Sequence, residues 1–408
     1  MRRRSRTIAI GNYDLRSSGT VQKSIEIATA LADAGLPSEL WVVRAEGGLK
    51  ARVPTDVPIV EVGSLLSPAL GRLADLTGGA LPLAWALRQR LPAVFLSGGN
   101  HLHLAAKSAV ALSGRRGSIR FGLRASNSSR RPIGPGGTEF SEPKRADRFK
   151  YEGADFVAAV SSALADEIAA FGGCARIDTI PNGVDLDRVR ANAGQPFDHP
   201  FFAARRPDGT PAPVLVSVGR VTHQKGFDIA IEALAMLPQE LGARLLVIGQ
   251  DSAGETDRLK QLTQERGVGD RVDFLGFHAN PFAVMCKADL YVSASRWEGA
   301  SNSLLEALAC GLPLVATDCP TGNREILADG SNGTLAPVED PAGLADAILA
   351  ELAIGRDRER QRRAADAFDL DACLGQWVEL LAEQYRIATG ESAAARTIAA
   401  EPRRRSGH

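Results

Sequence analysis

Two glutamates, Glu298 and Glu306, stand eight positions apart among small and apolar residues, in the stretch RWEGASNSLLEALACGLP. The residues before Glu298 are typical of a strand, and residues 302–310 are typical of a helix with Ser301 or Asn302 as its N-cap. A loop at the start of a helix offers backbone N–H groups to phosphate, and a carboxylate there can accept hydrogen bonds from the hydroxyls of a polyol. Taken alone, the pair is equally well explained by one carboxylate that favours the helix dipole and another that lies on the surface.

Two cations follow an earlier apolar run. Residues 213–219, PVLVSVG, indicate a strand, Gly219 allows a tight turn, and Arg220 and Lys225 lead into the next helix-like stretch. Cations at the carboxyl end of a strand can clamp a diphosphate and neutralise the charge of a leaving group. Ordinary solvated side chains are the alternative interpretation, and His223 between the cations is interpreted as a loop residue.

The elements that must position these side chains alternate between short apolar runs rich in Val, Ile and Leu and helix-like stretches. This pattern is typical of buried parallel sheets, so the sequence predicts an α/β protein of two doubly wound, Rossmann-like domains facing a central cleft. Ligands of such sheets bind beyond the carboxyl ends of the strands. The expected organisation is an N-terminal domain over 1–195, a linker around 192–213, a C-terminal domain over 210–365, a helix over 366–389 that packs back on the N-terminal domain, and a disordered tail over 390–408.

The composition fits a globular chain of two domains. Of the 408 residues 44% are hydrophobic and 24% charged, and the 48 basic and 48 acidic residues leave no net field that would recruit nucleic acid. Both ends are nevertheless rich in arginine, with MRRRSR at the start and EPRRRSGH at the end. These segments are interpreted either as solvated tails or as peripheral contacts with an anionic membrane.

Cysteine usage and apolar runs bear on the cellular location. The five cysteines lie scattered without a CxxC pair, which argues against a disulfide framework or a zinc site and favours a reducing cytoplasm. The sequence after the basic start turns polar too early for a signal peptide. The best apolar run, residues 80–87, falls short of the roughly 20 residues that cross a bilayer. A cytoplasmic location is therefore expected, at the inner face of the membrane if the arginine-rich ends bind lipid.

Several motifs in order resemble the family 4 (GT4) glycosyltransferases, which have the GT-B fold. GRVTHQKGFDIAIEAL (219–234), VDFLGF (272–277) and the run from Trp297 to Leu327 are similar to the donor-binding domain of that family, and EGASNSLLE fits its E-x7-E motif. IPNGVD (180–185) resembles the family's approach to the interdomain linker. The resemblance covers nearly the whole chain and is strongest over residues 155–340.

The resemblance implies a role for each matched residue. Glu298 and the backbone that follows it would hold the hydroxyls of a donor sugar, Glu306 would bind the ribose of a nucleotide, and Arg220 and Lys225 would grip the diphosphate. The implied catalytic residues are Arg220, Lys225 and Glu298, and the implied donor-binding residues are Gly19, Gly219, Leu275, Gly276, Gly299, Ala300, Ser301, Asn302 and Glu306. Such enzymes retain anomeric configuration and need no metal or other cofactor.

The N-terminal half departs from the family in two places. Family members commonly carry a Gly-Gly pair in the first strand-to-helix loop, where this chain has Ser18-Gly19, and many have a histidine where this chain has Asn127. His101, Arg124 and Asn127 are assigned to the acceptor side. His103 is interpreted with His101 as a helix cap or an acceptor contact. Residues 128–150, rich in glycine, proline and charge, are expected to form a mobile loop that lines the same side.

The leading hypothesis is a retaining, metal-independent transferase that moves a sugar from a nucleotide-sugar to a glycan or lipid-linked acceptor in cell-surface polysaccharide synthesis. A UDP-sugar is the favoured donor. A sugar-nucleotide epimerase of the same fold is the first alternative, and it would need acid and base residues rather than an acceptor groove. A catalytically silent homologue that binds a glycan or a partner protein is the second. That homologue would be expected to have lost the cations or the glutamates, whereas this sequence keeps all four.

Overall fold

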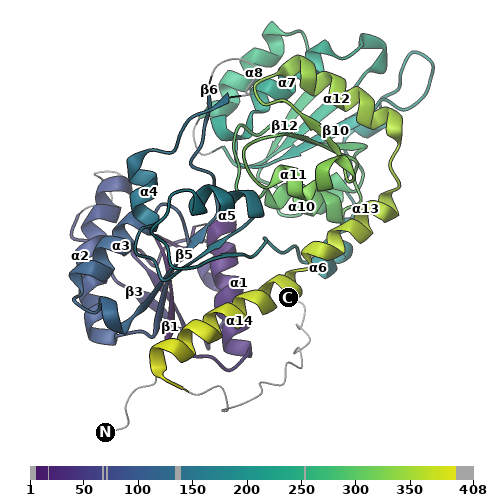
Figure 1. Ribbon diagram of the computed structural model, residues 1–408. Coiled ribbons are helices and arrows are strands. Elements are labelled where there is room, and N and C mark those ends of the chain that lie inside the picture. The colour runs from purple at the N-terminus through teal and green to yellow at the C-terminus, as the bar shows by residue number, and fades with distance from the viewer. Residues whose placement is uncertain are drawn as a thin grey trace.

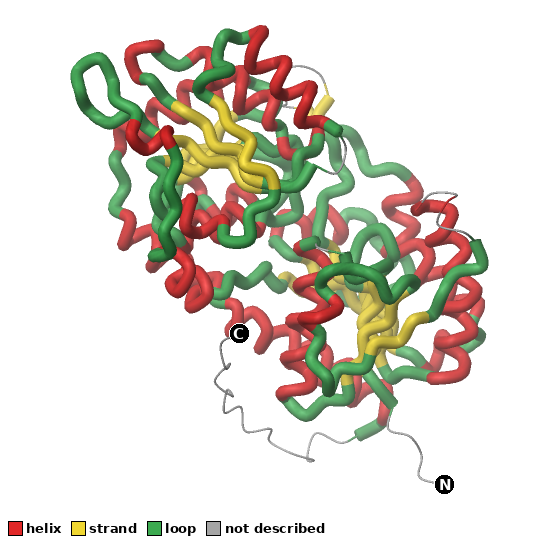
Figure 2. The backbone as a smooth tube through the Cα atoms, turned by 180° about the vertical axis from the view of Figure 1, so that it is seen from behind, coloured by secondary structure: helices red, strands yellow, loops and turns green. Residues whose placement is uncertain are grey.

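The computed structural model describes residues 6–391, apart from residues 17, 67–68, 70–71, 134–138 and 252–253, and gives no side-chain surroundings for 72–75. Two parallel sheets form the centres of two lobes, and helices cover both faces of each sheet (Figure 1). Seen from behind, the strands of each lobe lie between layers of helix (Figure 2). The predicted α/β fold with two Rossmann-like domains is confirmed.

The N-terminal sheet has seven parallel strands in the order β3-β2-β1-β4-β5-β8-β9. Register is regular, so that Ile8 of β1 pairs with Ser38 of β2 on one side and Val94 of β4 on the other. The central strands are buried on both faces, which is why they read as continuous apolar runs. The strands are β1 (Ile8–Asn12), β2 (Ser38–Val42), β3 (Ile59–Glu61), β4 (Val94–Ser97), β5 (Arg120–Ala125), β8 (Phe156–Ala159) and β9 (Ile177–Thr179).

Two separate cores hold helices against this sheet. One core joins the sheet to α2 (Arg72–Arg90), α3 (His103–Leu112), α4 (Arg145–Tyr151) and α5 (Ser162–Ala169). The other joins it to α1 (Gly19–Asp33) and to the last helix, α14 (Leu370–Thr389). Ser18 caps α1, because its Oγ accepts a hydrogen bond from Val21 N at 3.3 Å.

The C-terminal sheet has six parallel strands in the order β12-β11-β10-β13-β14-β15. One face packs on α7 (Phe227–Met236), α8 (Glu255–Glu265) and α12 (Pro341–Ile354). The other face packs on α6 (Leu186–Ala193), α9 (Pro281–Met285), α10 (Asn302–Ala309), α11 (Asn323–Ile326) and α13 (Arg358–Ala365). The strands are β10 (Val214–Val218), β11 (Arg244–Ile248), β12 (Val272–Gly276), β13 (Leu290–Ser293), β14 (Leu314–Thr317) and β15 (Thr334–Ala336).

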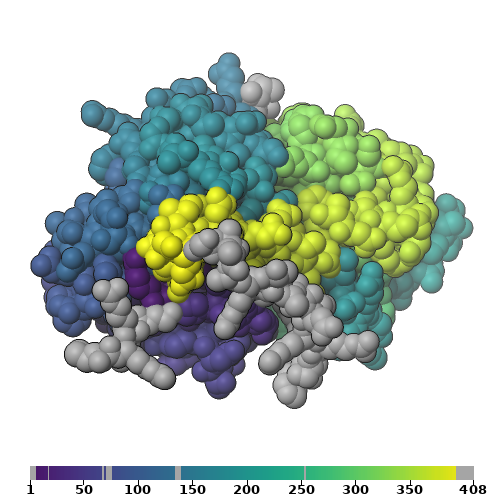
Figure 3. Space-filling view, turned by 60° about the horizontal axis from the view of Figure 1, so that its bottom comes forward, coloured from purple at the N-terminus to yellow at the C-terminus, as the bar shows by residue number. Residues whose placement is uncertain are grey.

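Helix α14 returns from the C-terminal lobe to the N-terminal one. Leu374, Trp377 and Leu381 of this helix lie in the same core as α1. Asp369, at the start of α14, forms an isolated parallel β-bridge with Val184. From below, this helix lies in yellow against the purple start of the chain (Figure 3). The domain boundaries expected at residues 195, 210 and 365 stay a proposal. The N-terminal sheet ends before the linker expected around residues 192–213, and the C-terminal sheet begins after it.

Three expectations need correction or fall outside the described residues. Residues 128–150 are not only a loop, because they contain α4 and a two-stranded hairpin of β6 (Pro132–Ile133) and β7 (Glu139–Phe140). Within the tail expected over 390–408, only Gly390 and Glu391 are described, and both arginine-rich segments lie outside the described residues except for Arg6.

Among the described helices, none has the length and apolar character needed to span a bilayer.

Candidate active site

The loop between β13 and α10 carries the first glutamate. Glu298 lies in this loop, Ser301 is the N-cap of α10, and Glu306 lies on the second turn of the helix. The strand, loop and helix are therefore where the sequence predicts them. The loop stands at the carboxyl end of a central strand, beside β10 in the sheet, which is the position where open parallel sheets bind ligands.

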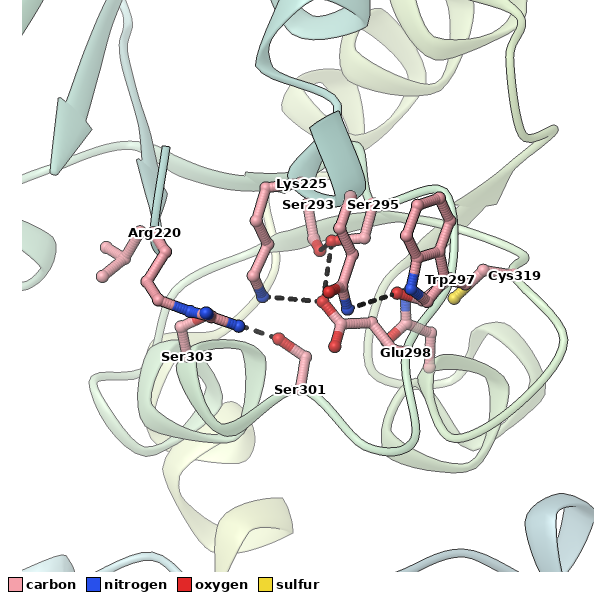
Figure 4. A network of polar contacts seen from close by, with 12 residues as sticks. Arg220, Lys225, Ser293, Ser295, Trp297, Glu298, Ser301, Ser303 and Cys319 are labelled. Atoms are coloured by element: carbon pink, nitrogen blue, oxygen red, sulfur yellow. Dashed lines mark hydrogen bonds and ion pairs between the residues drawn. The ribbon is translucent and has the colours of Figure 1, made fainter. Parts of the chain in front are cut away.

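Glu298 is held by Lys225 in a short contact (Figure 4). Lys225 Nζ lies 2.6 Å from Glu298 Oε1, and Ser295 Oγ donates to the same oxygen at 2.9 Å. Glu298 is only 7% exposed, so the ion pair lies where water screens it weakly. Lys225 ends a short 3₁₀ helix, η5 (His223–Lys225), immediately before α7.

Gly219 and Arg220 stand on the other side of the lysine. A Cβ on Gly219 would come 2.9 Å from Lys225 Cε, so a side chain there would crowd the lysine. Arg220 is exposed, leaves the loop after β10 and extends toward the start of α10, where Ser301 and Ser303 lie (Figure 4). The two cations therefore stand near a helix N-terminus, an arrangement that suits a diphosphate.

A buried arginine that sequence reasoning missed connects the segments that carry Lys225 and Glu298. Arg296 is 5% exposed, and its guanidinium binds Asp228 at 2.9 and 3.0 Å and also binds Glu339. It donates to the backbone oxygen of His223 at 2.7 Å, and its own N–H donates to Gln224 O at 2.8 Å. In the sequence, nothing distinguishes Arg296 except its position directly before the WEG stretch, because the residues that bind it lie far away along the chain.

The N-terminal domain holds the same loop from across the cleft. Ser128 N donates to Glu298 O at 3.1 Å, and Ser161 Oγ donates to Gly299 O at 3.0 Å. Asn182 Nδ2 donates to Ala300 O at 3.3 Å. A Cβ on Gly299 would lie 2.3 Å from Ser126 O, so only glycine permits this close approach of the two domains.

The N-termini of α1 and α10 also meet across the cleft. A Cβ on Gly19 would lie 2.7 Å from Asn302 Nδ2. Both residues line a pocket with Glu306, and burial raises the pKa of Glu306 to about 7 although Arg188 and Lys23 oppose the shift. The pocket is lined by Gly19, Gln22, Lys23, Glu26, Gly183, Val184, Asp185, Arg188, Val189, Phe282, Asn302 and Glu306.

The two histidines of the N-terminal domain have different surroundings. His103 is buried at the start of α3, with Nδ1 2.8 Å from Ser97 Oγ, and burial lowers its pKa to about 3. This ring is neutral at physiological pH and lies inside the fold rather than in the cleft, so its interpretation as an acceptor contact is wrong. His101 is exposed just before the same helix.

Arg124 and Asn127 stand at the end of β5. Arg124 is 2% exposed, Nη2 donates to Asn182 Oδ1 at 2.7 Å, and burial lowers its pKa to about 10. Its Nη1 is buried without a hydrogen-bond partner among the described residues. The backbone oxygen of Asn127 accepts from Asn100 Nδ2 at 3.1 Å. A direct acceptor contact by Arg124 or Asn127 remains a prediction.

Leu275 and Gly276 end β12, two strands from β10 in the sheet. Gly276 has a φ of 65°, and Phe277 after it is 72% exposed. The structure thus brings Lys225 and Glu298 into contact, places Gly19, Asn302 and Glu306 around one pocket, and leaves Leu275 and Gly276 outside the residues that line it. Their contact with a base stays a prediction.

Comparison with known proteins gives one family match in each of the two domains. Residues 18–188 match the family model described as Glycosyltransferase Family 4, and residues 212–353 match the model described as Glycosyl transferases group 1. A lipopolysaccharide core biosynthesis glycosyltransferase of Rhizobium meliloti is 29% identical over 59% of this chain and 68% of its own length.

A second relative, from Campylobacter jejuni, is an N-acetylgalactosaminyltransferase named for a diphospho-undecaprenol substrate. It is 32% identical over 38% of this chain, and the match spans 42% of its length. For other curated relatives, too, the chain matches less than half of their length.

Among solved structures, the fold is similar to that of Anabaena HepE in complex with UDP and glucose. The TM-score is 0.69 at 21% identity, over 93% of this chain and 100% of that one. At this identity the likeness establishes the fold, which is GT-B. Two family models that together span most of the chain, with the E-x7-E motif at the interdomain cleft, show that the chain belongs to the family 4 glycosyltransferases.

Proposed function

We propose that the protein is a retaining, metal-independent glycosyltransferase that takes a sugar from a nucleotide-sugar donor. The observation that carries this proposal is the contact of Lys225 Nζ with Glu298 Oε1 at 2.6 Å, in a partly buried loop before a helix N-terminus. Fixed cations and backbone N–H groups at one place suit a leaving diphosphate, and a neighbouring carboxylate suits sugar hydroxyls.

The proposed chemistry separates charge. When the bond from the anomeric carbon to phosphate breaks, negative charge grows on the diphosphate and positive character grows on the carbon. Arg220 and Lys225 would stabilise the first of these charges, together with the N-terminus of α10, without having to reorganise. Glu298 would hold the sugar hydroxyls and keep Lys225 in place. Glu306, on the second turn of α10, would accept hydrogen bonds from the ribose.

The donor and acceptor are proposed as classes. A UDP-sugar is favoured because a protein of similar fold is in complex with UDP and glucose. A glycan or lipid-linked acceptor, in cytoplasmic assembly of a cell-surface polysaccharide, is favoured because relatives are named for lipopolysaccharide core synthesis and for an undecaprenol substrate. The acceptor would enter from the N-terminal side of the cleft, past Arg124 and Asn127.

The first test is a thermal-stability screen of the purified protein with nucleotide-sugars and free nucleotides, because a ligand that binds only the folded state raises the melting temperature. A UDP-sugar is expected to raise it in the wild type and much less in Lys225→Met. Equal stabilisation of both proteins by every nucleotide would contradict the proposed diphosphate contact.

Further measurements separate this reaction from its alternatives. Proton NMR of the stabilising donor without acceptor should show slow release of sugar with its original anomeric configuration, in buffer containing a chelator. An epimerised nucleotide-sugar would instead establish the epimerase, and an inverted sugar would contradict retention. A protein that binds the donor but gives no turnover with any acceptor extract would favour the silent homologue.

A further inference from the structure

Two of the five free cysteines stand at equivalent places before neighbouring strands. Cys286 is the C-cap of α9 and lies four residues before the start of β13. Cys310 is the C-cap of α10 and lies four residues before the start of β14. The two strands are parallel neighbours, and their register pairs Tyr291 with Leu314. Segments that enter adjacent parallel strands in this register bring both cysteines to the same edge of the sheet.

The side chain of Cys286 lies against Cys310. Cys286 Sγ is 3.9 Å from Cys310 O, a distance that suits the weak hydrogen bond of a thiol. Helices α9 and α10 pack on each other, and both cysteines pack in the same core of the C-terminal lobe. Cys310 is 1% exposed, whereas Cys286 is half-buried. One member of the pair is therefore open to a small solute, and the other is enclosed beside it.

Two arginines of α13 stand beside the pair. Helix α13 packs on α10 (Figure 1), and Arg358 Nη1 donates to Cys286 O at 2.9 Å. A Cβ on Gly311, directly after Cys310, would lie 3.1 Å from Arg362 Nε. The side-chain hydrogen bond from Cys310 lowers the pKa of Cys286. The positive charges of Arg362 and Arg358 lower this pKa further, whereas burial opposes the shift. More of this thiol is then present as the thiolate, which is the reactive form.

The other three cysteines have surroundings that favour the neutral thiol. Burial raises the pKa of Cys174, Cys319 and Cys373. Cys174 is half-buried like Cys286, and its thiol donates to Arg176 O at 3.0 Å. Because the two residues share the same degree of exposure but differ in their surroundings, Cys174 is an internal control for the reactivity of Cys286.

We propose that Cys286 and Cys310 form a peroxide-reactive dithiol that is oxidised to a disulfide. The Cys286 thiolate attacks one oxygen of hydrogen peroxide, so that a sulfur–oxygen bond forms, the oxygen–oxygen bond breaks and hydroxide leaves. The Cys310 sulfur then attacks the sulfur of the resulting sulfenic acid. The disulfide bond forms, and the sulfenic hydroxyl leaves as water with the proton of the Cys310 thiol. Each cysteine sulfur gives up one electron, and the peroxide takes up both.

This disulfide closes a ring that contains part of the candidate active site. The two cysteines are 24 positions apart, and the segment between them contains β13, the loop with Glu298 and the whole of α10. A crosslink restricts the unfolded chain, so a disulfide that fits the native fold raises the melting temperature. In a reducing compartment such a bond is transient, and a dithiol reductant reverses it. The inference goes beyond the proposed reaction and does not depend on it.

The test treats the reduced, full-length protein with hydrogen peroxide and maps its cysteines by peptide mass spectrometry. We expect a crosslinked pair of peptides that contain Cys286 and Cys310, lighter by two hydrogen atoms, which dithiothreitol separates. Oxidation should raise the melting temperature by about 3 °C or more. In Cys310→Ala the sulfenic acid lacks its resolving thiol, so dimedone should label Cys286 at least about tenfold more than Cys174.

Matched variants separate this pair from general oxidation. Cys174→Ser should form the crosslink like the wild type, and Cys286→Ser should lose both the crosslink and the rise in melting temperature. Equal dimedone labelling of Cys174 and Cys286, or crosslinks spread over other cysteines or between two chains, would overturn the proposal. A melting temperature that stays the same or falls on oxidation would show that the bond does not fit the native fold, and would overturn it too.

Discussion

Lys225 Nζ and Glu298 Oε1 lie 2.6 Å apart although 73 residues separate them in the chain. The pair has two functions that substitutions can separate. It places a cation beside the helix N-terminus, and it neutralises a carboxylate side chain that is only 9% exposed. Removing one partner leaves the other charge partly buried and unpaired, which typically costs about 3 kcal/mol.

Lys225→Met and Glu298→Gln should each lower the transfer rate by ~10²-fold or more, because each removes charge or hydrogen bonding from the reacting centre. The double variant should regain part of the melting temperature lost by Lys225→Met but none of the activity. Rates come from turnover of the donor identified in the stability screen, and melting temperatures from circular dichroism. Activity within threefold of wild type in either single variant would contradict the proposed site.

Arg296→Met should impair catalysis more than its cost in stability explains. Arg296 ties Asp228, Glu339 and the backbone of η5 together, so its loss frees the segment that carries Lys225. We expect kcat to fall by at least about tenfold while the donor KM changes less, and Arg296→Lys should recover part of the rate.

Arg356→Met is the matched control for this prediction. Arg356 also binds a fully buried carboxylate, Glu351, in the same lobe, and it donates to the backbone of Gly330 and Ser331. Both variants should lose comparable stability, on the order of 3 kcal/mol, but the control should keep its kcat at temperatures where it is folded. A similar fall of kcat in both would reduce Arg296 to a structural residue.

Gly299→Ala should weaken contact between the domains. The added methyl group would lie 2.3 Å from Ser126 O, which belongs to the opposite domain and is backbone. We expect a larger radius of gyration by small-angle X-ray scattering and slower transfer, with little change in donor binding to the C-terminal domain. Gly194→Ala, whose Cβ would meet nothing within 4 Å, should behave as wild type. Unchanged scattering and rate in Gly299→Ala would contradict this role.

The sequence predicted the long apolar strands because parallel strands buried on both faces leave a continuous signal. The apolar runs that predict strands do not include β3 or β15, which have three residues each, and they do not include β5. In β5 the buried Gly122 lies against the ring of Phe156, where any Cβ would clash, and Arg120 and Arg124 interrupt the apolar pattern. Short or interrupted strands gain their stability from neighbours, which a single sequence does not display.

In the candidate site, too, local sequence patterns predicted some features and tertiary packing determines the others. Local spacing was enough to predict the loop, the helix and the positions of Glu298 and Glu306. The partners of Arg296, at positions 228 and 339, and the backbone contacts of Gly299 depend on tertiary packing. His103 shows the opposite error. A histidine near a cleft was given a possible binding role, whereas its ring is enclosed in the core.

Glu306 should make stability depend on pH. Burial raises its pKa to about 7 in the folded protein, from 4.5 for an ordinary glutamate. Between these values the folded state keeps a proton that the unfolded state has lost, so the free energy of unfolding falls as pH rises from 4.5 to about 7 and this contribution then levels off. Glu306→Gln cannot ionise and should lack this component. Relative to the variant, wild type should lose about 2 kcal/mol of unfolding free energy over that range, allowing for partial exposure to the pocket.

Denaturant melts of both proteins between pH 5 and 8 measure the difference. The control is Glu379→Gln, which replaces an exposed carboxylate on α14. A difference between wild type and Glu306→Gln that stays constant with pH would mean that Glu306 is ionised throughout and already paired with the cations around it.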